Sequence, residues 1–583
     1  MFLAALSLSA TDSLNPFRTG VTPGFVGVPV VVYYDPVDLP DPSLFQERQG
    51  ARVLIGAKGK LTENWEWSLD GTGEYGRSHS TGVNTNQNLT TFVTSAATGT
   101  LTQAQRRALY NPLADHNAFP RFDVMADYLN YNRQYTYYNS LAQVNLRVVG
   151  KLFEMPAGPV QISPGAEVIW NQFRTRATVG VSEAIRLAIP TGIIGPSNTR
   201  AQQARRTESA FFESVVPLIG PSWRPIPIES AELNLGVRWE GTDDSTNATS
   251  PVAALRLAAT KDIAFRVSYA EGFFPPDQSQ YEGARVNPAG ITPFTDPARG
   301  NLSYNYLKEE ISGGNPDLKP ETSQAWNYGI ILTPRVLPAL TLTLDFWKIE
   351  KENAILTVNG PSQLLASPES YPGRIQRAPA SPTDIANGWP GVVTSVDYRP
   401  VNVGFTQTEG ADIKARYTHN LGDLGKLTSL TSATWTNSFR DQILPINPIV
   451  ERVNSSANPL RWRGNTSLFW EYGRWTTGLT ATYINSYSAN TTTPSSAFPT
   501  GNGLDGDRIA SATLWDLQIG YQVPASRGFD RGWKSWVSDS KWTISVRNVL
   551  NKEPAFRTDV YSYYSRYEDP RQRYVTFQVK KSL

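Results

Sequence analysis

The strict alternation of apolar and polar residues is the feature that most restricts how this chain can fold. From Ala231 to Trp239, every odd position is apolar, and every even position is polar or glycine. A period of two places alternate side chains on opposite faces of an extended strand. This segment is therefore predicted to be a β-strand whose two faces meet different surroundings.

The same alternation recurs along most of the chain. It is clearest in residues 142–148, 263–269, 340–346, 411–417, 515–521, 542–546 and 575–579. All such segments together give about 17 strands, the first near residues 52–60 and the last at residues 573–583. Single-chain bacterial barrels have even numbers of strands. We therefore expect either one more strand in residues 24–35 or, as we favour, further strands missing on the N-terminal side.

The expected connections alternate between short turns and long polar loops. Short turns are expected at residues 61–64, 156–159, 260–262, 334–339, 421–425 and 471–474. Long loops are expected at residues 76–139, 272–323 and 352–408. Outer-membrane barrels have short periplasmic turns and long extracellular loops in this order. A soluble antiparallel sandwich also shows alternating strands, but loops of this length are uncommon in compact domains.

Aromatic residues lie at the ends of the apolar rows. Trp239, Tyr269 and Phe346 come just before long connections, whereas Trp65 and Trp475 come just after short turns. Amphipathic aromatic rings are favoured at membrane–water boundaries. The pattern predicts one aromatic girdle at each surface of a membrane.

The sequence has no apolar run of about 18 residues that could form a transmembrane helix. Lipid offers no hydrogen-bond partners to the backbone, so a closed sheet is the remaining way to span it. We therefore predict an all-β fold, a transmembrane antiparallel β-barrel in outer-membrane lipid. Residues 51–583 would form it, preceded by an irregular segment at residues 1–50 that is a remnant of an extracellular loop.

Composition narrows the possible chemistry. The chain has no cysteine, which excludes disulfides and thiolate metal sites, and its net charge of +2 gives no signal for nucleic acid. His79, His116 and His419 do not fall at metal-ligand spacing. No nucleophile elbow or phosphate-binding loop is present. We expect no enzyme activity, no metal and no cofactor.

One segment resembles a conserved motif of a known family. Residues 314–323 read GNPDLKPETS and are similar to the NPxLKPE segment of TonB-dependent receptors, which opens a strand after a long extracellular loop. The similarity is carried by Asn315, Pro316, Leu318, Pro320 and Glu321. These residues also have a plain structural reading, because proline favours an extended approach to a strand.

Three further segments resemble the same family in the same order. They are residues 269–276 (YAEGFFPP), 546–552 (VRNVLNK) and 569–574 (DPRQRY). The resemblance covers roughly residues 52–583 and implies part of a 22-stranded barrel, about 17–18 strands of it. It also implies that the plug domain and roughly the first five strands are absent.

The resemblance implies an outer-membrane uptake receptor for a scarce nutrient, such as an iron chelate, cobalamin or an oligosaccharide. Its implied partners are that small ligand, the barrel-insertion machinery and, only if a plug is supplied, the inner-membrane TonB energy-transducing complex. Three alternatives remain open: a passive pore or structural barrel, an outer-membrane hydrolase, and a soluble β-rich binding protein.

The candidate ligand-binding residues are mostly tyrosines in long loops. Residues 128–138 read YLNYNRQYTYY, and tyrosine, asparagine and arginine suit ligands that stack and accept hydrogen bonds. The candidates are Tyr128, Tyr131, Arg133, Tyr135, Tyr137, Tyr304 and Tyr306. Tyrosines at strand ends also anchor barrels at the membrane surface, so that role is the alternative for each of them.

Overall fold

The computed structural model describes most of the chain as β-strands. The described residues are 44–84, 131–181, 197–243, 247–488, 508–525, 537–554 and 571–581, with short gaps at 282, 284, 289–293, 305–306, 359 and 456–457. Single residues at 567 and 569 and parts of residues 4–34 are also described. Among these residues, no helix is long and apolar enough to cross a membrane.

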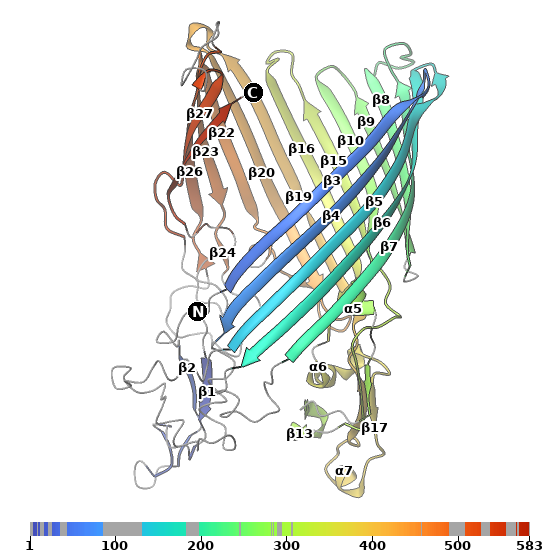
Figure 1. Ribbon diagram of the computed structural model, residues 1–583, viewed down its shortest axis with the longest axis vertical. Coiled ribbons are helices and arrows are strands. Elements are labelled where there is room, and N and C mark those ends of the chain that lie inside the picture. The colour runs from blue at the N-terminus through green and yellow to red at the C-terminus, as the bar shows by residue number, and fades with distance from the viewer. Residues whose placement is uncertain are drawn as a thin grey trace.

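One large sheet closes into a barrel of long, tilted strands (Figure 1). Its strands are β3 (Leu44–Thr62), β4 (Trp65–Asn84), β5 (Tyr131–Met155), β6 (Gly158–Val181), β7 (Ser197–Ile219), β8 (Ser230–Thr242), β9 (Asn247–Ala258), β10 (Ile263–Phe274), β15 (Glu321–Leu332), β16 (Leu340–Leu356), β19 (Val401–Asn420), β20 (Lys426–Gln442), β21 (Val450–Glu451), β22 (Trp462–Tyr472), β23 (Trp475–Ile484), β26 (Ala512–Gln522), β27 (Ser540–Arg547) and β28 (Tyr574–Lys581). Without the two-residue β21, 17 of these 18 strands span the wall, as the alternation predicted.

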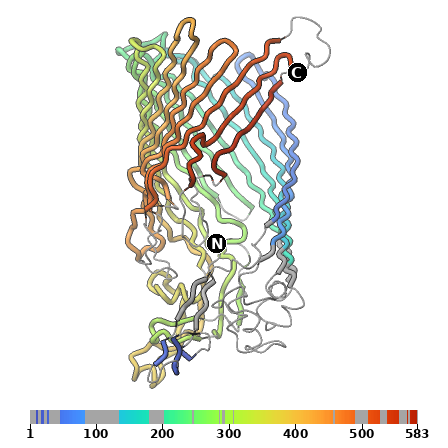
Figure 2. Tube along the Cα trace, turned by 90° about the vertical axis from the view of Figure 1, so that its left-hand side faces the viewer, coloured from blue at the N-terminus to red at the C-terminus, as the bar shows by residue number. Residues whose placement is uncertain are grey.

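The strands follow one another around the wall in chain order, and the paired neighbours with a described register are antiparallel. The predicted short turns all lie at the end that carries the C-terminus, at the top of Figure 1. Because the number of spanning strands is odd, β3 and β28 run in the same direction. These two strands are neighbours in the closed barrel, where the first and last strands of the sheet meet (Figure 2).

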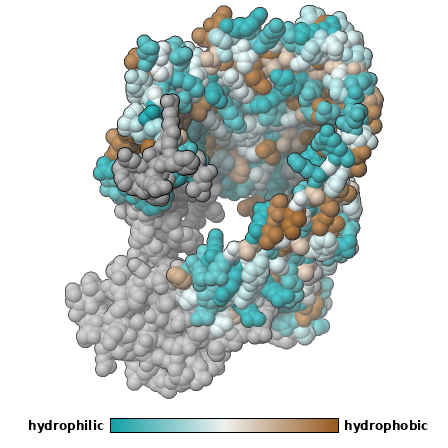
Figure 3. Space-filling model, turned by 45° about the horizontal axis from the view of Figure 1, so that its top comes forward, coloured by the Kyte–Doolittle hydropathy of each residue, from teal (hydrophilic) through white to brown (hydrophobic). Residues whose placement is uncertain are grey.

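The apolar rows of the strands face outward, and none of the described residues forms a second protein layer over them. Leu235, Val237 and Trp239 of β8 are 42%, 42% and 44% exposed. Polar residues on the other face hydrogen-bond to one another across the inside of the wall, which surrounds a deep hollow (Figure 3). This arrangement confirms the prediction of a barrel with an apolar outer face and a polar interior.

A second body of structure lies at the extracellular end, below the barrel in Figure 1. It is formed by the β10–β15 and β16–β19 connections and contains β11 (Arg285–Asn287), β12 (Phe294–Asp296), β13 (Leu302–Tyr304), β14 (Glu309–Ser312), β17 (Ile375–Arg377), β18 (Val393–Asp397), α5 (Gln278–Tyr281), α6 (Pro361–Ala366) and α7 (Pro382–Ala386), with 3-10 turns at Pro297–Arg299 and Pro368–Ser370. We call it the loop unit. A further 3-10 turn, Gly422–Leu424, and the short strands β24 (Tyr487–Ser488) and β25 (Arg508–Ile509) complete the elements beside the barrel.

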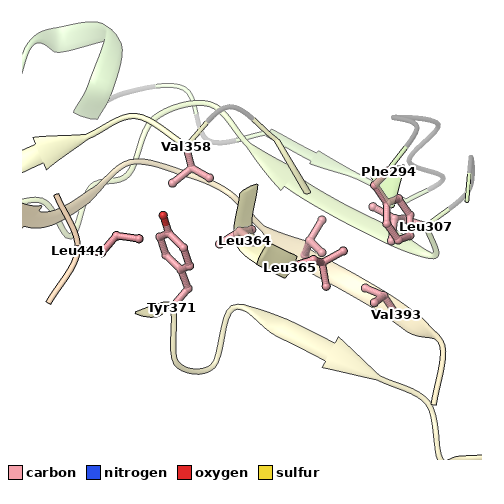
Figure 4. Close-up of a cluster of buried hydrophobic side chains, with 9 residues drawn as sticks. Phe294, Leu307, Val358, Leu364, Leu365, Tyr371, Val393 and Leu444 are labelled. Carbon is pink, nitrogen blue, oxygen red and sulfur yellow. The ribbon is translucent and has the colours of Figure 1, made fainter. Parts of the chain in front are cut away.

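The loop unit has its own hydrophobic core (Figure 4). The core consists of Phe294, Leu307, Val358, Leu364, Leu365, Tyr371, Val393, Val396 and Leu444, all buried. Three connections that are far apart in the sequence, β10–β15, β16–β19 and, through Leu444, β20–β21, therefore bury apolar side chains against one another. These segments were predicted as long polar loops without regular structure. That prediction was wrong, because they contain short strands and helices and pack into an ordered unit.

Two predicted boundaries also differ from the structure. The first wall strand begins at Leu44, inside the segment at residues 1–50 that was predicted to be irregular, and β1 (Ala4–Leu8) pairs with β2 (Val30–Tyr34) in that segment. The connection predicted at residues 76–139 is shorter, because β4 extends to Asn84 and β5 begins at Tyr131. The strands thus project well beyond the part of the wall that alternates between apolar and polar residues.

Candidate ligand-binding site at the extracellular mouth

Three aromatic rings form a ladder on the inner face of the wall near its extracellular end. The rings of Tyr135 and Tyr137 are parallel to within 3°, with centroids 6.1 Å apart. Tyr137 also stacks on Phe173 of β6, with centroids 5.9 Å apart and 20° between the planes. Val144 lies on the outward face of β5, and residues an odd number of positions away lie on the opposite face. Tyr135 and Tyr137 therefore face the interior.

Deeper in the barrel, the inner face carries a connected set of charged groups. The Arg238 guanidinium donates hydrogen bonds to Glu167 at 2.6 Å, to Ser209 at 2.7 Å and to Glu240 at 3.2 Å. The amide of Gln143 donates to Glu167 at 2.6 Å. The set crosses β5, β6, β7 and β8, so it holds these strands together on the periplasmic side of the aromatic ladder.

The β10–β15 connection reaches across to β7 beside the ladder. Arg205 Nη2 donates to the carbonyl of Pro276 at 2.7 Å, and the amide of Gln278 in α5 donates to the carbonyl of Ala204 at 2.7 Å. Gln203 of β7 pairs directly with Phe173 of β6. The loop therefore meets the wall one strand away from the ring of Phe173, and it borders the site.

The NPxLKPE-like segment anchors the loop unit to the barrel. Asn315 is 4% exposed, and its amide donates to the carbonyl of Pro400 at 2.8 Å. Its side-chain oxygen accepts from the backbone amide of Asp317 at 3.1 Å. The backbone amide and carbonyl of Lys319 both bond to the side chain of Asn402, each at 2.8 Å. The motif therefore joins the start of β15 to the start of β19.

Buried ion pairs hold the loop unit itself together. Arg299 pairs with Asp384 at 2.6 Å, and its Nε donates to the hydroxyl of Tyr304 at 2.7 Å. The hydrogen bond from Arg299 is the main cause that lowers the pKa of Asp384 to about 2, and the same bond raises the pKa of Arg299. Arg377 donates two hydrogen bonds to the carboxylate of Asp296, at 2.6 and 3.0 Å.

The structure distributes the seven sequence candidates among different places. Tyr135 and Tyr137 lie together in the ladder, on a strand rather than in the predicted loop. Tyr304 packs in the loop unit, where its ring stacks on Phe294 at 5.4 Å between centroids. Tyr131 and Arg133 belong to β5, but their side chains lie outside the described residues, as do Tyr128 and Tyr306 entirely.

Phe173, Arg205 and Gln278 line this region but were not predicted from the sequence. Phe173 is three residues past Trp170, where the polar and apolar positions no longer alternate, so only its pairing with β5 and β7 shows its role. The contacts of Arg205 and Gln278 are long-range and leave no local pattern.

The two described histidines, His79 and His419, lie on different strands and contact different residues. His79 lies 2.9 Å from the hydroxyl of Thr136, and His419 stacks on Tyr417 at 6.0 Å between centroids, near a short turn. His116 lies outside the described residues. Within the described part of the chain, no group of three or more histidine or carboxylate side chains could hold a metal ion.

Solved structures with a similar fold include an import receptor and a transporter. The ferric-catecholate import receptor Fiu from E. coli K12 is 11% identical, with a TM-score of 0.53, and the match covers 93% of this chain and 65% of that one. The RagAB peptide transporter is 12% identical, with a TM-score of 0.51 over 87% of this chain and 58% of that one. P. aeruginosa FpvA is 11% identical, with a TM-score of 0.50 over 91% of this chain and 55% of that one. The chain thus spans less than two thirds of the length of these structures.

The strand order and these likenesses define the fold as a large β-barrel of the outer-membrane type. The family described as "TonB dependent receptor-like, beta-barrel" matches residues 4–551, and the chain belongs to this family. The match confirms the resemblance found in the sequence and the outer-membrane location. No protein with a curated description matches the sequence.

Proposed function

We propose that this protein is a receptor that binds a small nutrient at its extracellular mouth for TonB-dependent uptake across the outer membrane. The aromatic ladder of Tyr135, Tyr137 and Phe173 carries the proposal, because it presents stacked rings to the barrel interior. Family membership supports the same role. Coupled transport also needs a plug domain and the TonB complex, so in this proposal the barrel described above supplies the wall and the mouth.

The ladder suits a ligand with a flat or ring-shaped surface. Aromatic rings stack on planar groups and on the apolar faces of sugars, and tyrosine hydroxyls add hydrogen bonds. Iron chelates with aromatic groups, cobalamin and oligosaccharides all offer such surfaces. The similar solved structures include importers of ferric catecholates and of peptides, and these compounds belong in the same test.

The test is ligand binding to the full chain in detergent, measured by quenching of tryptophan fluorescence. The probes are a ferric tris-catecholate complex, cobalamin, a linear oligosaccharide and a short peptide. The double variant Tyr135→Ala/Tyr137→Ala is expected to bind the preferred probe roughly 10- to 100-fold more weakly, since each lost ring contact contributes about 1 kcal/mol.

A matched control removes a stacked tyrosine from the outer face. Tyr328 is 50% exposed and stacks on Trp326, with centroids 6.0 Å apart and planes within 3°. Tyr328→Ala should leave binding unchanged, because the outer face does not meet a ligand in the mouth. Equal binding by the wild type and the double variant would refute the ladder as the site. Steady ion conductance by the full chain in planar bilayers, with no probe bound, would favour the passive-pore alternative.

A further inference from the structure

The outer face of β4, β5 and β6 carries three arginines near the extracellular ends of these strands. In the strand register, Arg77 of β4 lies directly opposite Tyr138 of β5, and Tyr138 lies opposite Arg174 of β6. Arg176 is two residues farther along β6, so it lies on the same face as Arg174. Tyr138 is an even number of residues from the outward Val144. The three arginines therefore face away from the barrel interior, and we call them the arginine cluster.

The arginine cluster lies just beyond the extracellular aromatic girdle. On the same outward face, Leu146 and Val144 of β5 are 45% exposed and nearer the periplasmic end. Tyr75 of β4 and Trp170 of β6 come next, 50% and 44% exposed. Aromatic girdles mark the boundary between the acyl chains and the headgroups. Arg77 is two residues past Tyr75, and Arg174 and Arg176 are four and six residues past Trp170, so the arginines lie on the headgroup side of these rings.

The positive charges of the cluster are not neutralised by the protein. Within the described part of the chain, none of the three arginines forms an ion pair. Arg174 donates to Gln172 at 3.0 Å, and the guanidinium of Arg176 lies 6.0 Å from the centroid of the Tyr138 ring. Nε of Arg77 is buried and has no hydrogen-bond partner. The exposed guanidinium groups of Arg174 and Arg176 are therefore ordered by neutral neighbours and keep most of their donors available.

Other cations on the outward face differ in this respect. Lys348 of β16 pairs with Glu350 at 2.7 Å, and Arg440 of β20 lies 3.7 Å from Glu451. Both cations face outward. Lys348 is two residues from the outward Phe346, and Arg440 lies opposite the outward-facing Gln407 of β19 in the strand register. These two outward cations thus have carboxylate partners, which the arginine cluster lacks among the described residues.

We propose that the arginine cluster binds the phosphate group of an anionic lipid in the outer leaflet. Guanidinium groups bind phosphate through paired hydrogen bonds and stay charged at every physiological pH. Cationic side chains at the membrane surface attract anionic headgroups, with about 1 kcal/mol per residue. The acyl chains of such a lipid would lie on the exposed apolar row of β5, on the periplasmic side of the arginine cluster. This site is separate from the ladder, which faces the interior.

The test measures lipid binding to the full chain in detergent. Phosphatidic acid is titrated, and native mass spectrometry detects the bound lipid. The wild type should bind phosphatidic acid in preference to phosphatidylcholine, and added salt should weaken this preference. The variant Arg174→Gln/Arg176→Gln removes two exposed charges and should bind phosphatidic acid roughly 30-fold more weakly. The control Lys348→Gln/Arg440→Gln removes the same charge from paired positions and should bind as the wild type does.

Each outcome bears on the proposal directly. Equal weakening in both variants would show a general charge effect and would overturn the assignment, as would equal affinity in the wild type and the cluster variant. If inorganic phosphate binds with the same dependence on Arg174 and Arg176 while phosphatidic acid does not, the site serves a soluble anion and the lipid assignment is wrong. Heat-modifiable gel mobility verifies folding. If the glutamine variant does not fold, absence of lipid preference in the wild type still overturns the proposal.

Discussion

Arg299 and Asp384 form an ion pair inside the loop unit, with 2.6 Å between Nη2 and Oδ1 and only 7% of each side chain exposed. The carboxylate of Asp384 also accepts a hydrogen bond from the backbone amide of Ser381 at 2.9 Å and so caps α7. One carboxylate therefore joins α7 to the 3-10 turn that ends at Arg299. The packing of two separate connections depends on the charge of this group.

The loop unit should therefore resist mild acid and come apart in strong acid. The pKa of Asp384 is about 2 in the folded protein, against about 3.9 for an unfolded aspartate. A lowered pKa stabilises the folded form fully above the unfolded value, and this stabilisation is lost as pH falls toward 2. Pepsin should cut residues 285–400 increasingly between about pH 4 and pH 2. Loss of protection above pH 5 would contradict this account.

The variant Asp384→Asn is the control for that transition. It leaves the Arg299 charge buried without its carboxylate, so the loop unit should be cut by pepsin already at pH 5. Its sensitivity should then change little between pH 4 and pH 2, whereas a transition like that of the wild type would show that another group is responsible.

Asn315 should be the critical side chain of the NPxLKPE-like segment for holding the loop unit. Asn315→Ala removes the bond to the carbonyl of Pro400 and the bond from Asp317, and the loss of such buried bonds costs about 1–3 kcal/mol each. Hydrogen exchange in residues 309–320 should accelerate. Lys319→Ala is the matched control, because only backbone atoms of Lys319 bond to Asn402. Equal acceleration in both variants would contradict the assigned role.

The junction of β3 and β28 should be the least protected part of the wall. Val53, Leu54 and Ile55 of β3 are 60%, 62% and 73% exposed, although successive residues face opposite sides. Both faces of this strand are therefore uncovered, and its junction with β28 joins strands that run in the same direction, a slightly less stable pairing than the antiparallel ladders elsewhere. Backbone amides of β3 should exchange with solvent deuterium well before those of β6, whose partners lie on both sides. Equal protection of β3 and β6 would show that the junction is as stable as the rest of the wall and would contradict this prediction.

The wall could be predicted from the sequence because lipid and water impose opposite demands on adjacent residues. That contrast marks β8 from Ala231 to Trp239 and gave the correct number of spanning strands. It disappears beyond the membrane, where both faces of a strand are wet. For this reason Tyr135 and Tyr137 were placed in a loop, although tyrosine and threonine favour strands.

The interior of the loop unit could not be predicted for a different reason. Phe294, Leu364 and Val393 are single apolar residues in segments with no period, and they come together only when two loops pack. The bonds of Arg299 to Asp384 and of Asn315 to Pro400 each join residues 85 positions apart. Such pairings are set by the tertiary structure and have no local sequence signal.

The central claim is that the two faces of each strand meet lipid and water, and two adjacent substitutions in β8 test it most directly. Leu235 faces outward near the middle of the strand, and Asn234 faces the interior. In refolding into lipid vesicles, Leu235→Arg should destabilise the barrel by roughly 2–4 kcal/mol in urea titration, because arginine is costly at the bilayer midplane. Asn234→Arg should cost far less. If the two variants are equally stable, the outer face does not contact lipid and the account is wrong.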